Sequence, residues 1–409
     1  MAPANDDVQT DNSLVSAWKA WDRFWFKPSD PTTLGLMRVI FGLTMLYVYV
    51  LYSFDLQALV GPNAWFDLAL ANEFRQESPI GAPAAGWEGA PPRSEPLTEE
   101  MQAYRVRWGA PEEQIQSKGQ YKWSIWYHVT SPAGIWIVHI GFLVVLLLFA
   151  IGFCTRVTSV LAWLGLLSYI HRAPTALFGM DTMSNLIMLY LVIAPSGAAL
   201  SVDRLIRRWW LARRARLAGR PAPVFGPPAP MVSATFATRL LQINVCAIYL
   251  VSGLSKLQGQ SWLSGVAVWL TMANYEFSPM RVPVYMESIR MLCSNWLAWQ
   301  IVVTGLTYGT LALEVSYAFI IWNPRLRWVM LAMVTLMHIG IAVCMGLVMF
   351  SVMMMIFNLA MVPPPVIKQF LNHLTGRADR LQLAASEGNG THAAHASRAG
   401  EAVRASARV

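Results

Sequence analysis

Long apolar segments alternate with polar segments along the chain, and the apolar ones set the expected fold. A helix that crosses a bilayer needs roughly 20 mostly apolar residues. Seven segments approach or exceed that length, and the last of them, 326–362, is long enough for two crossings. We divide it near Cys344-Met345-Gly346, although a single long tilted helix is the alternative. The expected spans are 34–53, 132–153, 157–176, 182–199, 237–257, 296–322 and two within 326–362.

This pattern predicts an all-α polytopic membrane protein with about eight transmembrane helices. The segment 262–277 follows the fifth span and is a candidate re-entrant or interfacial helix. The expected organisation is an N-terminal cytoplasmic segment 1–33 with an interfacial helix, a transmembrane domain 34–365, and a disordered cytoplasmic tail 366–409. Inside the domain we expect an outer loop 54–131, a cytoplasmic Arg-rich loop 200–235 and an outer loop 258–295.

Composition supports a membrane protein over a soluble one. Hydrophobic residues make up 55% of the chain and charged residues only 13%, where soluble domains carry about 25% charged residues. Mean hydropathy is +0.41. The 18 Trp and 13 Tyr are typical of the aromatic belts at membrane–water interfaces. We therefore expect membrane lipids as partners, and the protein partner is unknown.

The net charge of +8 comes from arginine clusters in particular loops, so we interpret it as a topology signal and expect no nucleic-acid partner. Seven arginines lie between spans four and five. Smaller clusters lie before span one, at Arg156, and at Arg325 and Arg327. Eight spans place all four clusters on one side, which the positive-inside rule makes cytoplasmic. We expect a multi-pass protein of the bacterial inner membrane, with both termini cytoplasmic.

Ionisable residues within spans are costly, so they are the first candidates for function. Lys256 ends span five on the outer side, with no acid beside it in the sequence. One interpretation is a lysine that extends to the headgroups. The other is a partly buried amine that acts as a base or binds an anion.

Glu314 and His338 lie in the middle of later spans. Glu314 is either a structural hydrogen-bonding group, a proton-handling group, or the counter-ion of an arginine or of Lys256. His338 is either a neutral imidazole hydrogen-bonded across helices or a proton relay. Lys256, Glu314 and His338 are the catalytic candidates.

A second polar group flanks the short outer turn between spans three and four. Arg172 and Asp181 are expected to pair or to form a polar mouth, and Asn185 shares one helix face with Asp181. These three are the candidate substrate-binding residues. Arg38, in the first turns of span one, is expected to extend to the cytoplasmic face, and His139 is expected to be structural.

No metal site is predicted. The four cysteines lie scattered in or beside apolar segments without metal-ligand spacing, and the chain has no HExxH, Gly-rich phosphate loop or GxSxG.

Six segments in the same order resemble the HTTM family, whose members share the transmembrane part of vitamin K-dependent gamma-carboxylase. They are "PSDPTTLGLMRVIFG" (28–42), "IGFCTRVTSVLAWL" (151–164), "SVDRL" (201–205), "YLVSGLSKLQGQSWLSG" (249–265), "LALEVSYAFII" (311–321) and "MHIGIAVCMGLVMFS" (337–351). Together they cover roughly residues 18–365.

The resemblance implies a role for Lys256. In the carboxylase, the lysine in this setting is thought to deprotonate a reduced quinone, vitamin K hydroquinone, on the lumenal side. Glu314 and His338 resemble an acidic position and a histidine of the same family. The sequence departs from the family at Asn185-Leu186, where the carboxylase has Asn-His, and it has a short tail where the carboxylase has a lumenal domain.

Two functions follow as hypotheses. One is a carboxylase-like or quinol-oxidising enzyme with an intramembrane lipid pocket that opens to the outer face, in which Lys256 is the base and the ligand is a lipid quinone. The alternative is a non-catalytic membrane module that binds a lipid or a partner protein. A single pocket lined by Lys256, Glu314, His338, Asp181 and Asn185 would favour the enzyme or a lipid site. A transporter ranks third, because no internal repeat is evident.

Overall fold

The computed structural model describes residues 13–69, 71–72, 123–221, 223, 225–276 and 278–374. Within these residues the secondary structure is helical, with one isolated antiparallel bridge between Ser29 and Met231. The α-helices of the first half are α1 (Ser13–Phe26), α2 (Thr32–Tyr52), α3 (Leu56–Val60), α7 (Pro132–Ile151), α8 (Thr155–Arg172), α9 (Gly179–Ile193) and α10 (Val202–Leu217). Those of the second half are α11 (Val232–Lys256), α12 (Gln260–Leu263), α13 (Ala267–Met272), α14 (Pro283–Cys293), α15 (Trp296–Ile320), α16 (Leu326–Met345), α17 (Val348–Asn358) and α18 (Pro364–Leu374). Short 3₁₀ turns are η1 (Ser53–Asp55), η3 (Ile125–Tyr127), η4 (Pro174–Ala176), η5 (Ser196–Ala198), η6 (Ser278–Arg281) and η7 (Leu359–Met361).

Each of the eight expected spans corresponds to a helix, and the fold is an all-α polytopic membrane protein. Five helices of the described chain are long and apolar enough to cross a membrane, and a bent pair at the end raises this to six. Helix α9 has 15 residues and α17 has 11, so both are shorter than a full crossing. The division within 326–362 is present, because Gly346 adopts a φ of +69° and ends α16.

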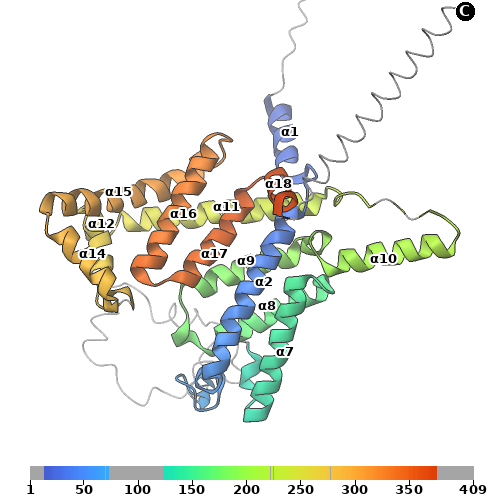
Figure 1. Ribbon diagram of the computed structural model, residues 1–409, viewed down its shortest axis with the longest axis horizontal. Coiled ribbons are helices and arrows are strands. Elements are labelled where there is room, and N and C mark those ends of the chain that lie inside the picture. Colours follow the sequence, from blue (N-terminus) through green and yellow to red (C-terminus); the bar gives the residue numbers. More distant parts are fainter. Residues whose placement is uncertain are drawn as a thin grey trace, which may run out of the picture.

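The bundle core is made by the apolar faces of the long helices (Figure 1). Helix α2 packs along α7, where Gly42 brings the two backbones together: a Cβ at this position would lie 2.8 Å from the Cα of Ala150. Aromatic rings fill this interface toward the end of α2, with the centroid of Tyr49 at 4.9 Å from that of Phe142 and 4.6 Å from that of Tyr169. Trp126 of η3 is buried against Tyr169 and covers the end of α8.

Arg38 does not extend to the headgroups, so the prediction for this residue is wrong. Its side chain is fully buried, and its guanidinium donates to the carbonyl oxygens of Ser196, at 2.8 Å, and of Leu200. The turn after α9 presents these carbonyls without helical partners of their own. The arginine therefore satisfies backbone acceptors inside the protein, as membrane burial demands.

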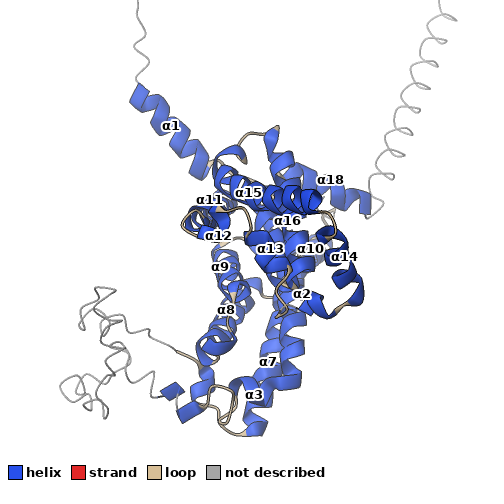
Figure 2. Ribbon diagram, turned by 90° about the vertical axis from the view of Figure 1, so that its left-hand side faces the viewer, coloured by secondary structure: helices blue, strands red, loops and turns tan. Residues whose placement is uncertain are grey.

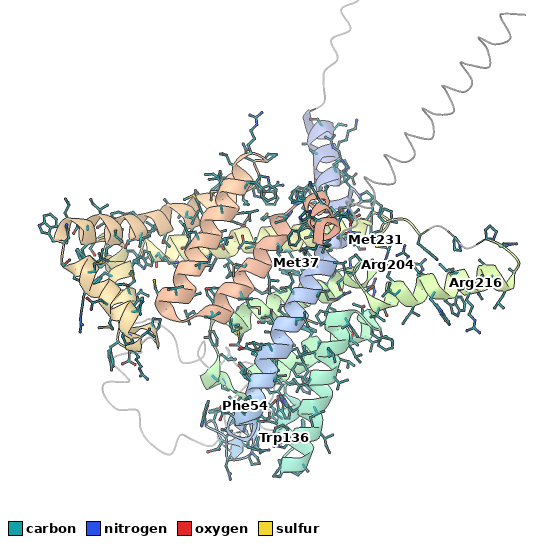
Figure 3. The ribbon with its side chains drawn as sticks, in the orientation of Figure 1. Met37, Phe54, Trp136, Arg204, Arg216 and Met231 are labelled. Carbon is teal, nitrogen blue, oxygen red and sulfur yellow. The ribbon has the colours of Figure 1, made fainter. Side chains whose placement is uncertain are left out.

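The four basic clusters gather at the end of the bundle where α2 begins. Asp203 of α10 accepts from the backbone N–H of Cys154 (2.7 Å) and Thr155 (2.8 Å), which joins the Arg-rich segment to the start of α8. Arg239 of α11 donates to the carbonyl of Phe24 and lies 5.9 Å from the ring of Trp322. In Figure 3, Met37, Arg204 and Met231 lie at this end, whereas Phe54 and Trp136 lie at the other.

Two boundaries of the expected loops are wrong. The Arg-rich segment expected as a loop over 200–235 contains helix α10 and the first turn of α11. Residues 366–374, expected in the disordered tail, belong to α18, which begins within Pro363-Pro364-Pro365 and is bent by 113° from the preceding helix. Proline cannot donate a backbone hydrogen bond and so favours a break there. Residues 375–409 and most of the outer loop 54–131 lie outside the described residues.

Helix α18 is held to the start of α2 by an ion pair between Lys368 and Asp30 (2.5 Å). Burial raises the pKa of the Asp30 carboxyl, but the contacts with Lys368 and Thr32 outweigh it and hold this pKa below its ordinary value. A lowered carboxylate pKa contributes stability that is fully present above the unfolded value, about 4, and is lost as the pH falls through the folded value.

We therefore expect Asp30→Asn at neutral pH to loosen α18, as acidification below about pH 4 does in the wild type. Hydrogen exchange of residues 364–374, corrected for the intrinsic effect of pH, measures this. Glu287→Gln, which alters an exposed ion pair on α14, is the control. Equal exchange in Asp30→Asn and wild type at neutral pH would contradict the expectation.

Candidate functional site

Helices α11 and α15 lie side by side (Figure 1) and approach closely at Gly253. A Cβ at Gly253 would lie 2.8 Å from Val315 Cγ2 and 3.2 Å from Glu314 Cβ. Because Gly253 has no side chain, the turn of α11 that carries Lys256 can meet the turn of α15 that carries Glu314.

Lys256 and Glu314 form an ion pair across this interface. The Lys256 Nζ donates to both carboxylate oxygens of Glu314, at 2.7 and 2.6 Å, and to the Ser252 hydroxyl at 2.7 Å. The Glu314 side chain is 7% exposed and that of Lys256 is 22% exposed. The ammonium also lies 5.3 Å from the ring centroid of Trp262. Lys256 therefore pairs with an acid on another helix, and the interpretation of a lysine that only extends to the lipid headgroups does not describe it.

A separate buried chain of hydrogen bonds lies at the same helix interface, among α11, α15, α16 and α17. Tyr317 donates to Asn358 Oδ1 at 2.5 Å, and Asn358 Nδ2 donates to the Tyr249 hydroxyl at 2.9 Å. Tyr249 in turn lies 2.9 Å from Nε2 of His338. The four residues come from α15, α17, α11 and α16, so the chain ties four helices together; Figure 2 labels three of them, α11, α15 and α16, next to one another.

Counting donors and acceptors assigns the tautomer of His338. Tyr249 already accepts from Asn358, so its own hydroxyl proton is free to donate to Nε2 of His338. The proton of the neutral imidazole then lies on Nδ1. This Nδ1 is buried and has no hydrogen-bond partner. His338 is hydrogen-bonded across helices to Tyr249, one ring nitrogen is left without a partner, and its neutral state stays a prediction.

The ion pair and the hydrogen-bonded chain share one helix interface. Tyr249 and Lys256 are seven residues apart on α11, so they lie on one face about 10 Å apart along the axis. Tyr317 follows Glu314 by three residues on α15, and the rings of Tyr317 and Tyr249 stand 4.3 Å apart. The three catalytic candidates therefore belong to one region of the fold.

The candidate substrate-binding residues lie elsewhere. Arg172 does not pair with Asp181: it donates to the backbone carbonyls of Gly61 and Phe66, both at 2.6 Å, and joins the end of α8 to the segment after α3. Asp181 accepts from the backbone N–H of Phe178 at 3.0 Å and caps the start of α9. Asn185 accepts from the Trp163 indole at 2.8 Å. None of these bonds reaches Lys256 or Glu314. The expected pairing of Arg172 with Asp181 is wrong, because each side chain binds backbone groups, and the alternative of a polar mouth stays a prediction.

Two cavities among the described residues do not match the expected common pocket. Asp181 lines a cavity of about 10 Å³ with Tyr49, Tyr52 and Tyr169, which is at the lower limit of the space that one water molecule needs. A second cavity of about 250 Å³, almost entirely apolar, lies between α7 and α8 beside Phe142 and Gly165. Neither cavity includes Lys256. Beside the first, His139 bonds to Ser53 (2.8 Å) and Tyr169, which fits its expected structural role.

Sequence reasoning missed Ser252, Tyr249, Tyr317 and Asn358. Helical spacing was a usable signal for three of them. Ser252 precedes Lys256 by four residues and Tyr249 by seven, while Tyr317 follows Glu314 by three. Asn358 carries no such signal, because its partners lie far away in the sequence. Among the described residues, no group of three or more His, Cys, Asp or Glu side chains is placed to hold a metal ion.

The fold and this site define an integral membrane protein with a buried ion pair and a polar network inside its helical bundle. Compared with known proteins, the chain matches no family model, no curated protein and no solved structure.

Proposed function

We propose that the chain is an HTTM-type membrane protein whose Lys256–Glu314 pair is an acid–base centre that takes a proton from a hydroxyl group of a lipid-soluble substrate. The observation that supports it most directly is the contact of Lys256 Nζ with both oxygens of a nearly buried carboxylate. We also propose that the basic end of the bundle faces the cytoplasm of a bacterial inner membrane, because four basic clusters meet there.

The pair offers two proton acceptors that depend on each other. As an ion pair, Glu314 is the base and the Lys256 ammonium stabilises the oxyanion that a substrate hydroxyl leaves behind. If the proton of Lys256 moves to Glu314, the neutral amine of Lys256 becomes the base. Low dielectric favours this neutral form relative to water, because charged groups lose solvation. The unpartnered Nδ1 of His338 is a further proton-exchanging atom of the same interface.

A reduced quinone such as vitamin K hydroquinone, which the resemblance implies, belongs to this substrate class. The 22% exposed side of Lys256 beside Trp262 is where a hydroxyl group could approach the amine. Neither of the two cavities described above includes Lys256, so the proposal does not place a two-ring quinone in either of them. No step of the proposal depends on a bound quinone.

The test uses the full chain in lipid nanodiscs with a reduced naphthoquinone as probe, and its oxidation in air is followed by absorbance. Lys256→Arg keeps the positive charge but removes the base, since arginine does not deprotonate in proteins. Glu314→Gln keeps the shape but removes the proton acceptor. We expect each variant to lower the rate by about 100-fold or more, the usual effect of losing a general base.

Lys368→Met is the matched control, because it breaks an ion pair at the opposite end of the bundle. Its rate is expected to equal that of the wild type. Equal rates for wild type, Lys256→Arg and Glu314→Gln would overturn the acid–base proposal. They would favour the alternative, a non-catalytic membrane module that binds a lipid or a partner protein, in which the pair only joins α11 to α15.

A further inference from the structure

Helix α10 stands apart from the rest of the bundle. It contains no buried residue, and in Figure 1 it leaves the bundle sideways, so that Arg216 lies near its far tip in Figure 3. A helix that buries nothing gains little from packing and needs another source of stability in water. The exposed side chains of α10 therefore indicate which surroundings stabilise the helix.

One face of α10 contacts Phe225 and Gly226, which belong to the segment between α10 and α11. Arg204 donates to the carbonyl of Gly226 and Arg208 to that of Phe225, both at 2.7 Å. The Arg208 guanidinium also stacks on the Phe225 ring at 5.0 Å. These contacts fix which side of α10 faces the protein.

The opposite face is exposed and carries apolar side chains. Ile206 follows Arg204 by two residues, which turns it by roughly 200° around the helix. Ile206, Trp209 and Trp210 then share one face, at the spacing i, i+3 and i+4. The exposed apolar side chains of α10 are Leu205, Ile206, Trp209, Trp210, Leu211 and Leu217. Few soluble surfaces leave two adjacent tryptophans half exposed on one helix face.

The charge around this face has one sign. The exposed arginines are Arg207, Arg213, Arg214, Arg216 and Arg220. The one acidic residue of α10, Asp203, is already used to cap α8. The guanidinium of Arg214 lies 3.9 Å from the ring centroid of Trp210, and that of Arg213 lies 5.4 Å from that of Trp209. The tryptophans and the positive charges therefore occupy the same surface.

We propose that α10 lies on the bilayer surface, with Trp209 and Trp210 at the boundary between headgroups and acyl chains and its arginines bound to anionic lipids. Only residues 194–201 separate α10 from α9, and α11 enters the bundle at Val232, so the helix cannot leave the vicinity of the membrane. A basic amphipathic helix with tryptophan on its apolar side is typical of interfacial helices. Each arginine near an anionic surface strengthens binding about fivefold. The proposal is independent of the Lys256–Glu314 centre.

The test reconstitutes the full chain into vesicles whose acyl chains carry bromine, which quenches tryptophan only on contact. The vesicles are of phosphatidylcholine alone or with added phosphatidylglycerol. The difference between wild type and a Trp209→Phe/Trp210→Phe variant isolates the fluorescence of these two residues. We expect their quenching to rise about twofold or more when anionic lipid is added, and to fall again at high salt.

A variant with Arg207, Arg213, Arg214 and Arg216 changed to Gln is expected to lose the response to anionic lipid. Arg156→Gln, an exposed arginine on α8, is expected to keep it. Trp136, exposed on the apolar helix α7, is the positive control and should be quenched in both kinds of vesicle. Quenching of Trp209 and Trp210 that is absent in both, or that is unchanged by lipid charge and by the four substitutions, would overturn the proposal.

Discussion

Lys256→Met is expected to destabilise the protein by about 3 kcal/mol, because it leaves the buried Glu314 carboxylate without its partner. Removing one member of a buried ion pair typically costs 3–5 kcal/mol, and the partial exposure of Lys256 places this pair at the lower end of about that range. The unpaired carboxylate must either stay ionised in a medium of low dielectric or take up a proton. Thermal unfolding in a mild detergent measures the loss.

The double variant Lys256→Met/Glu314→Leu is expected to recover most of this stability. Replacing both charges by apolar side chains of similar size removes the desolvation cost together with the attraction, and such replacements are often neutral or stabilising. A double-mutant cycle gives the coupling free energy directly. Two single effects that simply add would show that Lys256 and Glu314 do not act as a pair.

Lys368→Met is again the matched control. Its ion pair with Asp30 is more exposed than that of Lys256, with 35% of the Lys368 side chain accessible. Water screens such pairs, and their contribution is about 1 kcal/mol or less. The difference between Lys256→Met and Lys368→Met therefore reports the burial of the pair, since the substitution itself is the same.

The second large effect is expected from Gly253→Leu, which should separate α11 from α15 and open the Lys256–Glu314 contact. A Cβ at this position already lies 2.8 Å from Val315 Cγ2 and 3.1 Å from the Val315 backbone nitrogen. The Val315 side chain is β-branched and has little rotamer freedom to give way. Overpacking of this kind costs about 1–3 kcal/mol, and we expect the upper part of that range.

Gly309→Leu on α15 is the control for Gly253→Leu. A Cβ at Gly309 meets nothing within 4 Å, so the same substitution is expected to be neutral or slightly stabilising there. Gly253→Leu should also lower the oxidation rate of the reduced naphthoquinone, whereas Gly309→Leu should leave it unchanged. Equal unfolding temperatures for the two variants would show that α11 and α15 can move apart without cost.

The sequence by itself determined the fold class and the positions of the long apolar helices, of which five or six in the described chain are long enough to cross a membrane. In lipid, backbone polar groups must be hydrogen-bonded within the protein. A helix of about 20 apolar residues achieves this with local bonds, so its pattern can be seen in the sequence. It also singled out Lys256, Glu314 and His338 as candidate functional residues, because ionisable residues within apolar segments are costly and therefore rare. The expectation that the basic clusters lie at one end of the bundle came from the expected count of eight spans.

Only the tertiary structure decided the partners of these residues. Lys256 was one of several possible counter-ions of Glu314, and the two meet because Gly253 allows two helices 58 residues apart in sequence to touch. Arg172 binds the carbonyls of Gly61 and Phe66 and not Asp181, although Asp181 is the nearer acid in the sequence. The Arg38 side chain likewise lies inside the bundle, where its guanidinium donates to the carbonyls of Ser196 and Leu200 after α9. Hydrogen-bond partners in a bundle depend on helix packing, which apolar periodicity leaves open.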